Sequence, residues 1–219
     1  MKNPLSFLSR KNLETSYDVL RTRFPLASII VLILTGFLFY VVHAEPGSMV
    51  YLRIILSLIV TFFLSIGVSL SLEDKNVSYK KIWNIAPLIY GTLFYISMNS
   101  LTNEWMLDSI TYFILHLVGF IGFLFFAPYI TNLFYDKKQS IEYTNYFTRT
   151  AWAILMSCIV GGSLIALGFI AIASVVTLFD ISKLINEEKT YANWAIISLS
   201  LVAPLYCLIH LPAVKEVEK

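Results

Sequence analysis

Six long apolar runs, each bounded by polar or charged residues, divide the chain. They cover residues 24–42, 51–72, 82–98, 109–130, 147–179 and 191–211. A helix needs about 20 apolar residues to cross a hydrocarbon layer roughly 30 Å thick. Strands are excluded for these runs, because an open sheet edge would leave unpaired backbone groups in lipid. The pattern therefore predicts an all-α, polytopic transmembrane helix bundle of about six spans.

Prolines fall within the third and sixth runs, and the fifth run is unusually long. Pro87 in the third run and Pro204 in the sixth lack a backbone donor, so we expect each to kink its helix. The fifth run would reach roughly 45 to 50 Å at 1.5 Å per residue. It must either tilt or project its ends into the headgroups, and Gly161 and Gly162 are a place to bend.

The segment before the first run is mixed in character. Leu13, Tyr17 and Leu20 recur at helical spacing among charged residues, which predicts a short amphipathic helix over residues 7–20, lying on the membrane surface. A mobile basic tail is the alternative. The predicted organisation is a cytoplasmic amphipathic segment over 1–23, a six-helix transmembrane domain over 24–211, and a cytoplasmic tail over 212–219.

Composition strengthens the membrane assignment. Apolar residues make up 58% of the chain and charged residues 14%, with a mean hydropathy of +0.74. Soluble domains carry about 25% charged residues and under 50% apolar ones, so lipid must be the solvent for the excess. The net charge of +2 and the lack of a Lys/Arg-rich block argue against nucleic acid as a partner.

The basic residues predict the orientation. Cytoplasmic segments of membrane proteins are enriched in Lys and Arg. With the N-terminus inside, thirteen of the sixteen basic residues fall in inner segments, and only Arg53, Lys183 and Lys189 fall outside. We therefore predict that both ends are cytoplasmic. The four tryptophans fall near predicted helix ends, as in an aromatic belt: Trp83, Trp105, Trp152 and Trp194.

Known catalytic and cofactor motifs are missing from the sequence. There is no GxSxG, HExxH, GxGxxG, P-loop or CxxC. Cys158 and Cys207 both lie within apolar runs, which favours reduced packing residues over a disulfide or a metal site. We expect no enzymatic activity, no cofactor and no metal.

Histidine is the main ionisable residue type in the predicted spans. His43, His116 and His210 lie at different predicted depths, so they do not converge on one metal. An ionisable group within the membrane is a functional candidate, and His116 is the one placed there. A neutral imidazole bonded to a neighbouring helix is the alternative.

The second run carries the other polar candidates. Ser57, Thr61, Ser65 and Ser69 recur every four residues, which places a small polar ridge on one helix face. Such a ridge serves either close helix packing or the lining of a pathway. Arg53, at the outer start of this run, lies near Glu45, Glu104 and Asp108 in depth. It either forms a salt bridge there or binds an anionic headgroup or substrate.

Small residues also recur in the fifth run. Ser157 and Gly161 form one small-xxx-small ridge, and Cys158, Gly162 and Ala166 form another. We therefore expect the second and fifth helices to be the central members of the bundle.

Three short stretches resemble one protein family. They are Arg23-Phe24-Pro25-Leu26-Ala27, the run from Ser163 to Ile181, and Ala203-Pro204-Leu205 with Leu211-Pro212. Together they resemble the uncharacterised bacterial inner-membrane family known as domain of unknown function 4153. Members of that family are longer, so the resemblance implies a short member or an N-terminal portion, located in the bacterial cytoplasmic membrane. It implies no catalytic residues.

Two functions remain open. The chain is either a component of a transport or envelope process, or a scaffold or sensor whose basic inner face docks a partner or anionic lipid. An intramembrane enzyme is disfavoured, because no acid, base and nucleophile share one depth. The lipid bilayer is the expected partner, together with a protein or a second copy of the chain.

Overall fold

The protein is an all-α membrane protein. The computed structural model describes residues 10–44, 49–73, 83, 85–100, 106–135, 143–180 and 186–213, and none of these lies in a strand. Within these ranges five helices are long and apolar enough to cross a membrane: Pro25–His43, Met49–Ser71, Ile110–Tyr129, Thr144–Phe179 and Glu187–His210. The predicted all-α polytopic bundle is confirmed.

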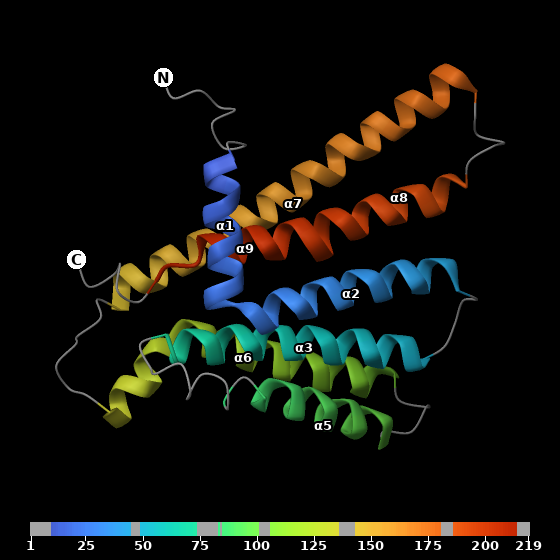
Figure 1. Ribbon diagram of the computed structural model, residues 1–219. Coiled ribbons are helices and arrows are strands. Elements are labelled where there is room, and N and C mark those ends of the chain that lie inside the picture. The colour runs from blue at the N-terminus through green and yellow to red at the C-terminus, as the bar shows by residue number, and fades with distance from the viewer. Residues whose placement is uncertain are drawn as a thin grey trace.

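The helices lie roughly side by side, with one exception at the start of the chain (Figure 1). They are α1 (Arg10–Arg23), α2 (Pro25–His43), α3 (Met49–Ser71), α5 (Ala86–Ser100), α6 (Met106–Tyr135), α7 (Tyr143–Phe179), α8 (Glu187–Ile196), the π-helical segment η2 (Ile197–Val202) and α9 (Ala203–His210). Below, the end where α2 begins and α3 and α9 finish is the Arg23 end. The opposite end, where α3 begins, is the Arg53 end.

Contacts between helices establish the direction of each passage. Ser71 of α3 donates to the carbonyl of Ala127 in α6 at 2.9 Å, so both helices finish at the Arg23 end. Since α3 and α6 run parallel, the chain between them must return to the Arg53 end. There Arg53 bonds to Asn99 at 2.8 Å and Ser97 to Tyr112 at 3.2 Å. The segment that contains α5 therefore makes this return passage.

The third predicted span is shorter than expected. It corresponds to α5, which has 15 residues, fewer than the roughly 20 needed to cross hydrocarbon. Residues 82 and 84 of the predicted run lie outside the described part. The described residues thus form five full-length candidate spans, and the short helix α5 lies on the return passage between α3 and α6. The count of six spans stays a prediction.

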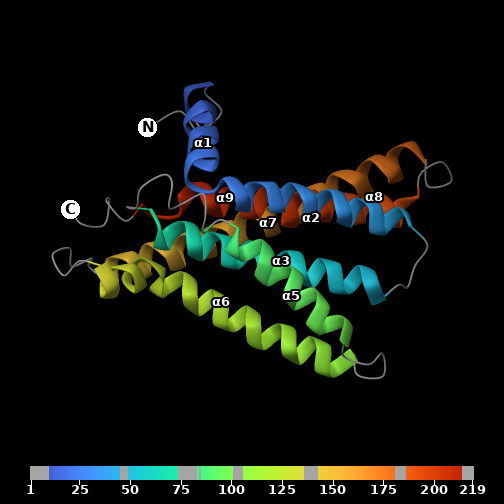
Figure 2. The same cartoon turned by 60° about the horizontal axis from the view of Figure 1, so that its bottom comes forward.

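The corner between α1 and α2 follows from Phe24 and Pro25. The residue before proline is restricted away from the helical region, while proline suits the first position of a helix. Phe24 has φ −129° and ψ 48°, and α2 begins at Pro25. As a result α1 turns away from the bundle (Figure 2). The predicted N-terminal helix is confirmed over Arg10–Arg23; residues 7–9 lie outside the described part, and its position on a membrane surface stays a prediction.

Two buried apolar clusters join the helices. The larger lies at the Arg23 end and joins α2, α3, α6, α7 and α9: Phe24, Ala27, Ile66, Leu70, Leu124, Ala127, Ala153, Leu208 and Leu211. The smaller, Leu56, Val60, Phe94 and Met98, joins α3 to α5. Large apolar side chains also point outward, such as Leu115 at 70% and Leu178 at 79% exposure. Apolar residues on both faces are what a bundle surrounded by lipid requires.

The expected kink at Pro87 is wrong. Pro87 lies in the first turn of α5. Backbone N–H groups in the first turn make no hydrogen bond within the helix, so a proline there breaks none. The proline inside a helix is Pro128 of α6. Its missing N–H leaves the carbonyl of Leu124 without its usual partner, and the hydroxyl of the fully buried Tyr146 in α7 donates to that oxygen at 3.1 Å.

The last span is irregular beside Pro204, and the kink expected there stays a prediction. One π-helical segment, Ile197–Val202, separates α8 from α9, and the N–H of Ala203 bonds to the carbonyl of Ser198 five residues earlier. The buried hydroxyls of Ser200 and Thr35 lie 3.0 Å apart and connect this segment to α2. The wider π-helical turn accommodates Pro204, which follows it in the first turn of α9.

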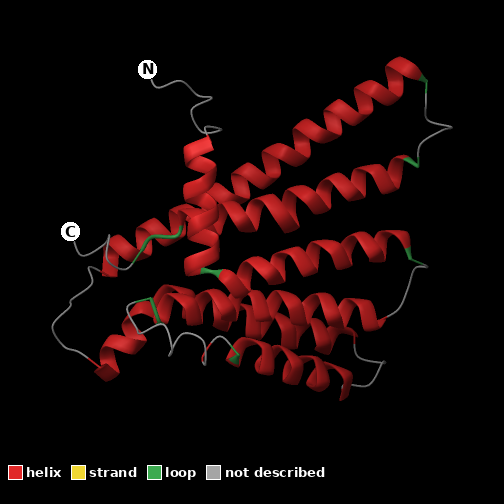
Figure 3. Cartoon of the chain, viewed as in Figure 1, coloured by secondary structure: helices red, strands yellow, loops and turns green. Residues whose placement is uncertain are grey.

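Helix α7 is long, as predicted, but it is not central. It runs unbroken through Gly161 and Gly162 over 37 residues, and it diverges from α8 towards the Arg53 end (Figure 3). Ser157 and Gly161 face the bundle, where an added Cβ on Gly161 would meet the Cβ of Ala203 at 2.9 Å. The second ridge faces outward, since Cys158, Gly162 and Ala166 are all exposed. Only α3, packed against α2, α5 and α6, is central as expected.

Candidate functional site: a basic and aromatic cavity at the Arg23 end

A cavity of about 470 Å³ opens at the Arg23 end between α1, α7 and α9. Its lining comes from all three helices and from the residues after α9: Val19, Arg23, Thr148, Arg149, Trp152, Ala153, Met156, Tyr206, Ile209, His210, Leu211 and Pro212. The lining combines two guanidinium groups and an imidazole with a tryptophan and a tyrosine, and none of its described residues is acidic. Hereafter it is the Arg149 cavity.

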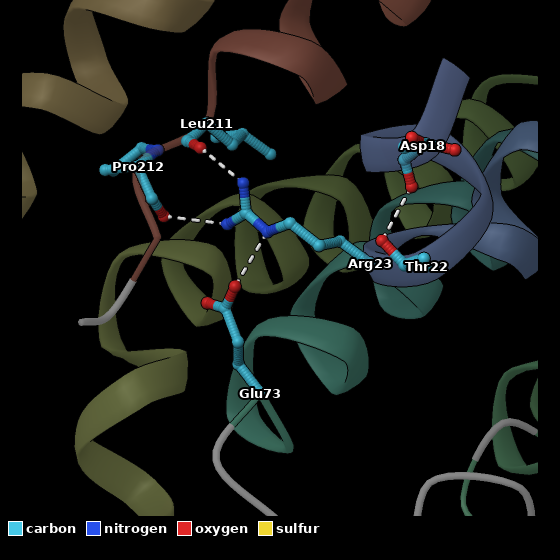
Figure 4. Close-up of polar contacts among 6 residues, drawn as sticks. All are labelled: Asp18, Thr22, Arg23, Glu73, Leu211 and Pro212. Atoms are coloured by element: carbon cyan, nitrogen blue, oxygen red, sulfur yellow. Dashed lines mark hydrogen bonds and ion pairs between the residues drawn. The ribbon is translucent and has the colours of Figure 1, made fainter. Parts of the chain in front are cut away.

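Arg23 holds one side of the cavity in place (Figure 4). Its Nε donates to Glu73 Oε1 at 2.7 Å, and Nη1 and Nη2 donate to the carbonyls of Leu211 and Pro212 at 3.0 and 3.1 Å. Both charged side chains are largely buried, at 19% and 16% exposure. The carbonyls after α9 lack intrahelical donors, and arginine's planar fork supplies them. The end of α1 is thereby joined to the residues that follow α3 and α9.

The positive charge open to a ligand belongs to Arg149. Because Glu73 offsets the charge of Arg23, the latter is structural. Arg149 lies on α7, is exposed, and has no hydrogen bond or ion pair with any other residue that the structure describes. A guanidinium binds phosphate or carboxylate oxygens in a bidentate fashion. The cavity therefore presents a ready donor for an anionic group.

Aromatic side chains flank this charge. Trp152 is 58% exposed and lies one turn from Arg149 on α7. On α9, Tyr206 and His210 stack with ring centroids 4.1 Å apart, and His210 Nδ1 lies 2.8 Å from the carbonyl of Tyr206. Tryptophan and tyrosine are favoured at the level of lipid headgroups, where one side of the ring is apolar and the other wet. The cavity thus has the composition of a headgroup site.

The predicted ridge on α3 is buried. Ser57, Thr61 and Ser65 are at most 7% exposed, and Ser69 is half-buried. Ser57 and Thr61 donate to the carbonyls of Arg53 and Ser57 four residues earlier, each at 2.7 Å, and Ser65 donates to Phe62. Thr61 also lies directly against Gly91 of α5. These contacts are those of a packing ridge.

Arg53 is buried at the opposite end of the bundle. It is 9% exposed and donates from Nη1 to Oδ1 of Asn99 on α5. The acidic residues expected near it, Glu45, Glu104 and Asp108, have side chains outside the described part, so both readings of Arg53 stay predictions.

His116 is enclosed by aromatic rings near the Arg53 end. Tyr112 and Phe94 lie closest, with ring centroids 4.2 and 5.1 Å away. Its Nδ1 lies 2.8 Å from the carbonyl of Tyr112 in the same helix. The imidazole is therefore bonded within its own helix, not to a neighbouring one. It also lines a separate groove on α6.

The Arg149 cavity was not among the sites predicted from the sequence. Neither Arg23 nor Arg149 was a predicted site residue, since nothing in the sequence shows that α7 and α9 meet there. The available signal for the site was that both arginines, like Trp152 and Tyr206, lie near predicted helix ends. Among the described residues, no three His, Cys, Asp or Glu side chains are close enough to hold a metal.

Comparisons with known proteins leave the chain without an assigned relative. No family model, curated protein or solved structure matches it. The resemblance to domain of unknown function 4153 therefore stays a prediction, and functional inference rests on the geometry of the chain itself.

Proposed function

We propose that this integral membrane protein binds a phosphate-bearing anionic lipid headgroup in the Arg149 cavity, and that it works as a non-enzymatic scaffold or sensor in the bacterial cytoplasmic membrane. The observation that carries the proposal is the exposed Arg149 beside Trp152, Tyr206 and His210, with no acidic residue among the described residues of the lining. The guanidinium suits the phosphate of a lipid headgroup, and the aromatic rings suit the boundary between headgroups and acyl chains.

The position of the cavity supports a lipid over a soluble anion. It opens where α7 and α9 meet the base of α1, next to apolar lining residues such as Met156 and Ile209. A lipid can place its phosphate on Arg149 and its upper acyl chain against these residues. The predicted orientation also supports a lipid. The excess of Lys and Arg in the predicted inner segments predicts that the Arg23 end faces the cytoplasm, where anionic lipids are enriched.

A component of a transport or envelope process is the alternative function, and the described structure offers it less support. The hydroxyls that could line a pathway through α3 are buried and bonded to backbone carbonyls. Satisfied hydroxyls in a packed interface have no role in guiding a polar substrate.

Lipid titrations followed by native mass spectrometry test the proposal. The purified protein in detergent is titrated with phosphatidylglycerol or with zwitterionic phosphatidylcholine. We expect saturable, preferential binding of phosphatidylglycerol, and an apparent Kd about tenfold weaker for Arg149→Gln, the effect of losing one charge-assisted hydrogen bond. Phosphatidylcholine binding should be unchanged by the substitution.

Arg21→Gln is the matched control, because Arg21 is an exposed arginine of α1 that does not line the cavity. If both substitutions weaken phosphatidylglycerol binding equally, the attraction is diffuse and the proposed site is wrong. Displacement of the lipid by millimolar inorganic phosphate would show that the cavity binds a free anion instead.

A further inference from the structure

A second cavity, on the side of the bundle, is independent of the Arg149 cavity. It is a groove of about 490 Å³ between α3 and α6, lined by Leu64, Leu115, His116, Gly119, Phe120 and Phe123. Leu115 at its rim is 70% exposed, which is the exposure of a side chain that faces lipid. The groove therefore opens sideways, towards the bilayer. Hereafter it is the His116 groove.

Glycine makes one part of this groove hollow. A Cβ added to Gly119 would meet no heavy atom within 4 Å. Farther along the same helix pair the surfaces close, because a Cβ on Gly67 of α3 would run into the ring of Phe123. The groove thus has a closed side at Phe123 and an open floor at Gly119, next to the imidazole.

His116 is the only side chain with a nitrogen or oxygen in the described lining, and its hydrogen bond determines what it can recognise. A carbonyl oxygen can only accept, so the Nδ1 that lies 2.8 Å from the carbonyl of Tyr112 carries the proton. Nε2 of the neutral ring is then an acceptor, and it has no hydrogen bond from any described residue. The surrounding rings of Tyr112 and Phe94 hold the imidazole in place.

Depth and lining exclude charged ligands. His116 is six residues into the apolar stretch Ile110–Tyr129, which corresponds to about 9 Å along the helix. An ion at that depth without a partner is costly, and the described lining of the groove contains no charged side chain that could pair with one. Its occupant must be apolar apart from one hydrogen-bond donor.

We propose that the His116 groove binds a membrane-soluble phenol or quinol. The flat ring lies over Gly119 beside Phe120 and Phe123, and its hydroxyl donates to Nε2 of His116. A cavity of about 150 Å³ is enough for one benzene ring, so the groove also has room for the first part of an alkyl or isoprenoid tail. A quinone has only acceptor oxygens, so the neutral imidazole selects the reduced form.

The test compares two probes that differ by one donor. The protein in nanodiscs is titrated with 4-nonylphenol or its methyl ether, and partition into empty nanodiscs is subtracted. We expect saturable binding of the phenol that is roughly fivefold to tenfold tighter than that of the ether. The ¹⁵N resonance of His116 Nε2 should shift with the phenol alone.

Variants check the position of the site. His116→Phe should abolish the preference for the phenol, and Gly119→Leu should fill the groove and weaken both probes. Gly36→Leu is the control, since Gly36 is exposed on α2 and its added Cβ also meets nothing within 4 Å. Equal saturable binding of the two probes to the unmodified protein overturns the proposal, and so does unchanged binding in Gly119→Leu.

Discussion

At the scale of single residues, Arg23 shows why an arginine and not a lysine is needed at the Arg23 end. Its three nitrogens bond to one carboxylate and two carbonyls at 2.7 to 3.1 Å. The acceptors come from two separate segments, the end of α3 and the residues after α9. A lysine ammonium is a compact point charge and cannot span them in this planar arrangement.

We therefore expect Arg23→Lys to lower the free energy of unfolding by about 1 kcal/mol, and Arg23→Gln by about 1 to 3 kcal/mol. The second value is below the roughly 3 to 5 kcal/mol for a fully buried pair, because both partners retain some contact with water. Unfolding in SDS mixed micelles, followed by circular dichroism, measures both. Arg21→Gln should change the stability by less than about 0.5 kcal/mol. A fully stable Arg23→Lys variant would show that the planar fork is not required.

At the scale of elements, the contact between α6 and α7 depends on a defect in one helix. Pro128 removes the donor that the carbonyl of Leu124 would use, and Tyr146 replaces it from the neighbouring helix. Two ring pairs also join these helices, Phe125 with Phe147 at 4.7 Å and Tyr129 with Tyr146 at 6.4 Å between centroids, and the Tyr146 hydroxyl adds a polar contact to them.

Tyr146→Phe should lower the free energy of unfolding by about 1 to 3 kcal/mol, because it leaves a buried carbonyl unsatisfied. The same substitution should have a smaller effect in a Pro128→Ala background, where residue 128 regains its N–H and can bond to Leu124. A double-mutant cycle in mixed micelles measures this difference. Additive effects of the two substitutions would contradict the proposed exchange of donors.

The elements themselves were largely predictable from the sequence, because hydrophobic length alone determines where a chain can cross lipid. The described bounds of α2, α3 and α6 agree with the predicted runs within a few residues at each end, apart from the longer C-terminal end of α6. Pro87 was misread because the start of its helix could not be located in a polar stretch. The role of Pro128 depends on Tyr146, which lies in another helix, so no local pattern could reveal it.

At the scale of the whole molecule, successive passages from α2 onwards alternate in direction, with α8, η2 and α9 forming one passage, and the corner before α2 meets the residues after α9. Helix α7, at 37 residues, is about 55 Å long, against roughly 30 Å of hydrocarbon. It must therefore tilt in the membrane or extend beyond it. Figure 1 shows that α7 also diverges from α8 towards the Arg53 end.

Thiol labelling in intact cells tests the predicted topology of six passages with both ends inside. In a Cys158→Ala, Cys207→Ala background, Ser100→Cys and Asn186→Cys should react with a membrane-impermeant maleimide. Arg21→Cys and Thr148→Cys should react only after lysis. Labelling of the second pair alone would reverse the orientation, and labelling at sites from both ends would contradict the topology.

Neither cavity could be assembled from the sequence alone. The lining of the Arg149 cavity comes from α1, α7 and α9, and only packing brings Val19, Thr148 and His210 together. His116 was identified as a candidate, yet its free acceptor depends on a backbone contact that the sequence does not show. Sequence patterns predict which residues enter the membrane, whereas helix packing determines which of them share a space.

The link from Arg23 to Leu211 also has a consequence for the order of assembly. The two residues are 188 positions apart, and at about 5 to 20 residues per second a ribosome needs roughly 10 to 40 s to make that stretch. During this time Arg23 has Glu73 as an acceptor but neither carbonyl. The earlier helices must therefore insert before these contacts exist, and the contacts between the first and last helices form only after the last helix has been synthesised.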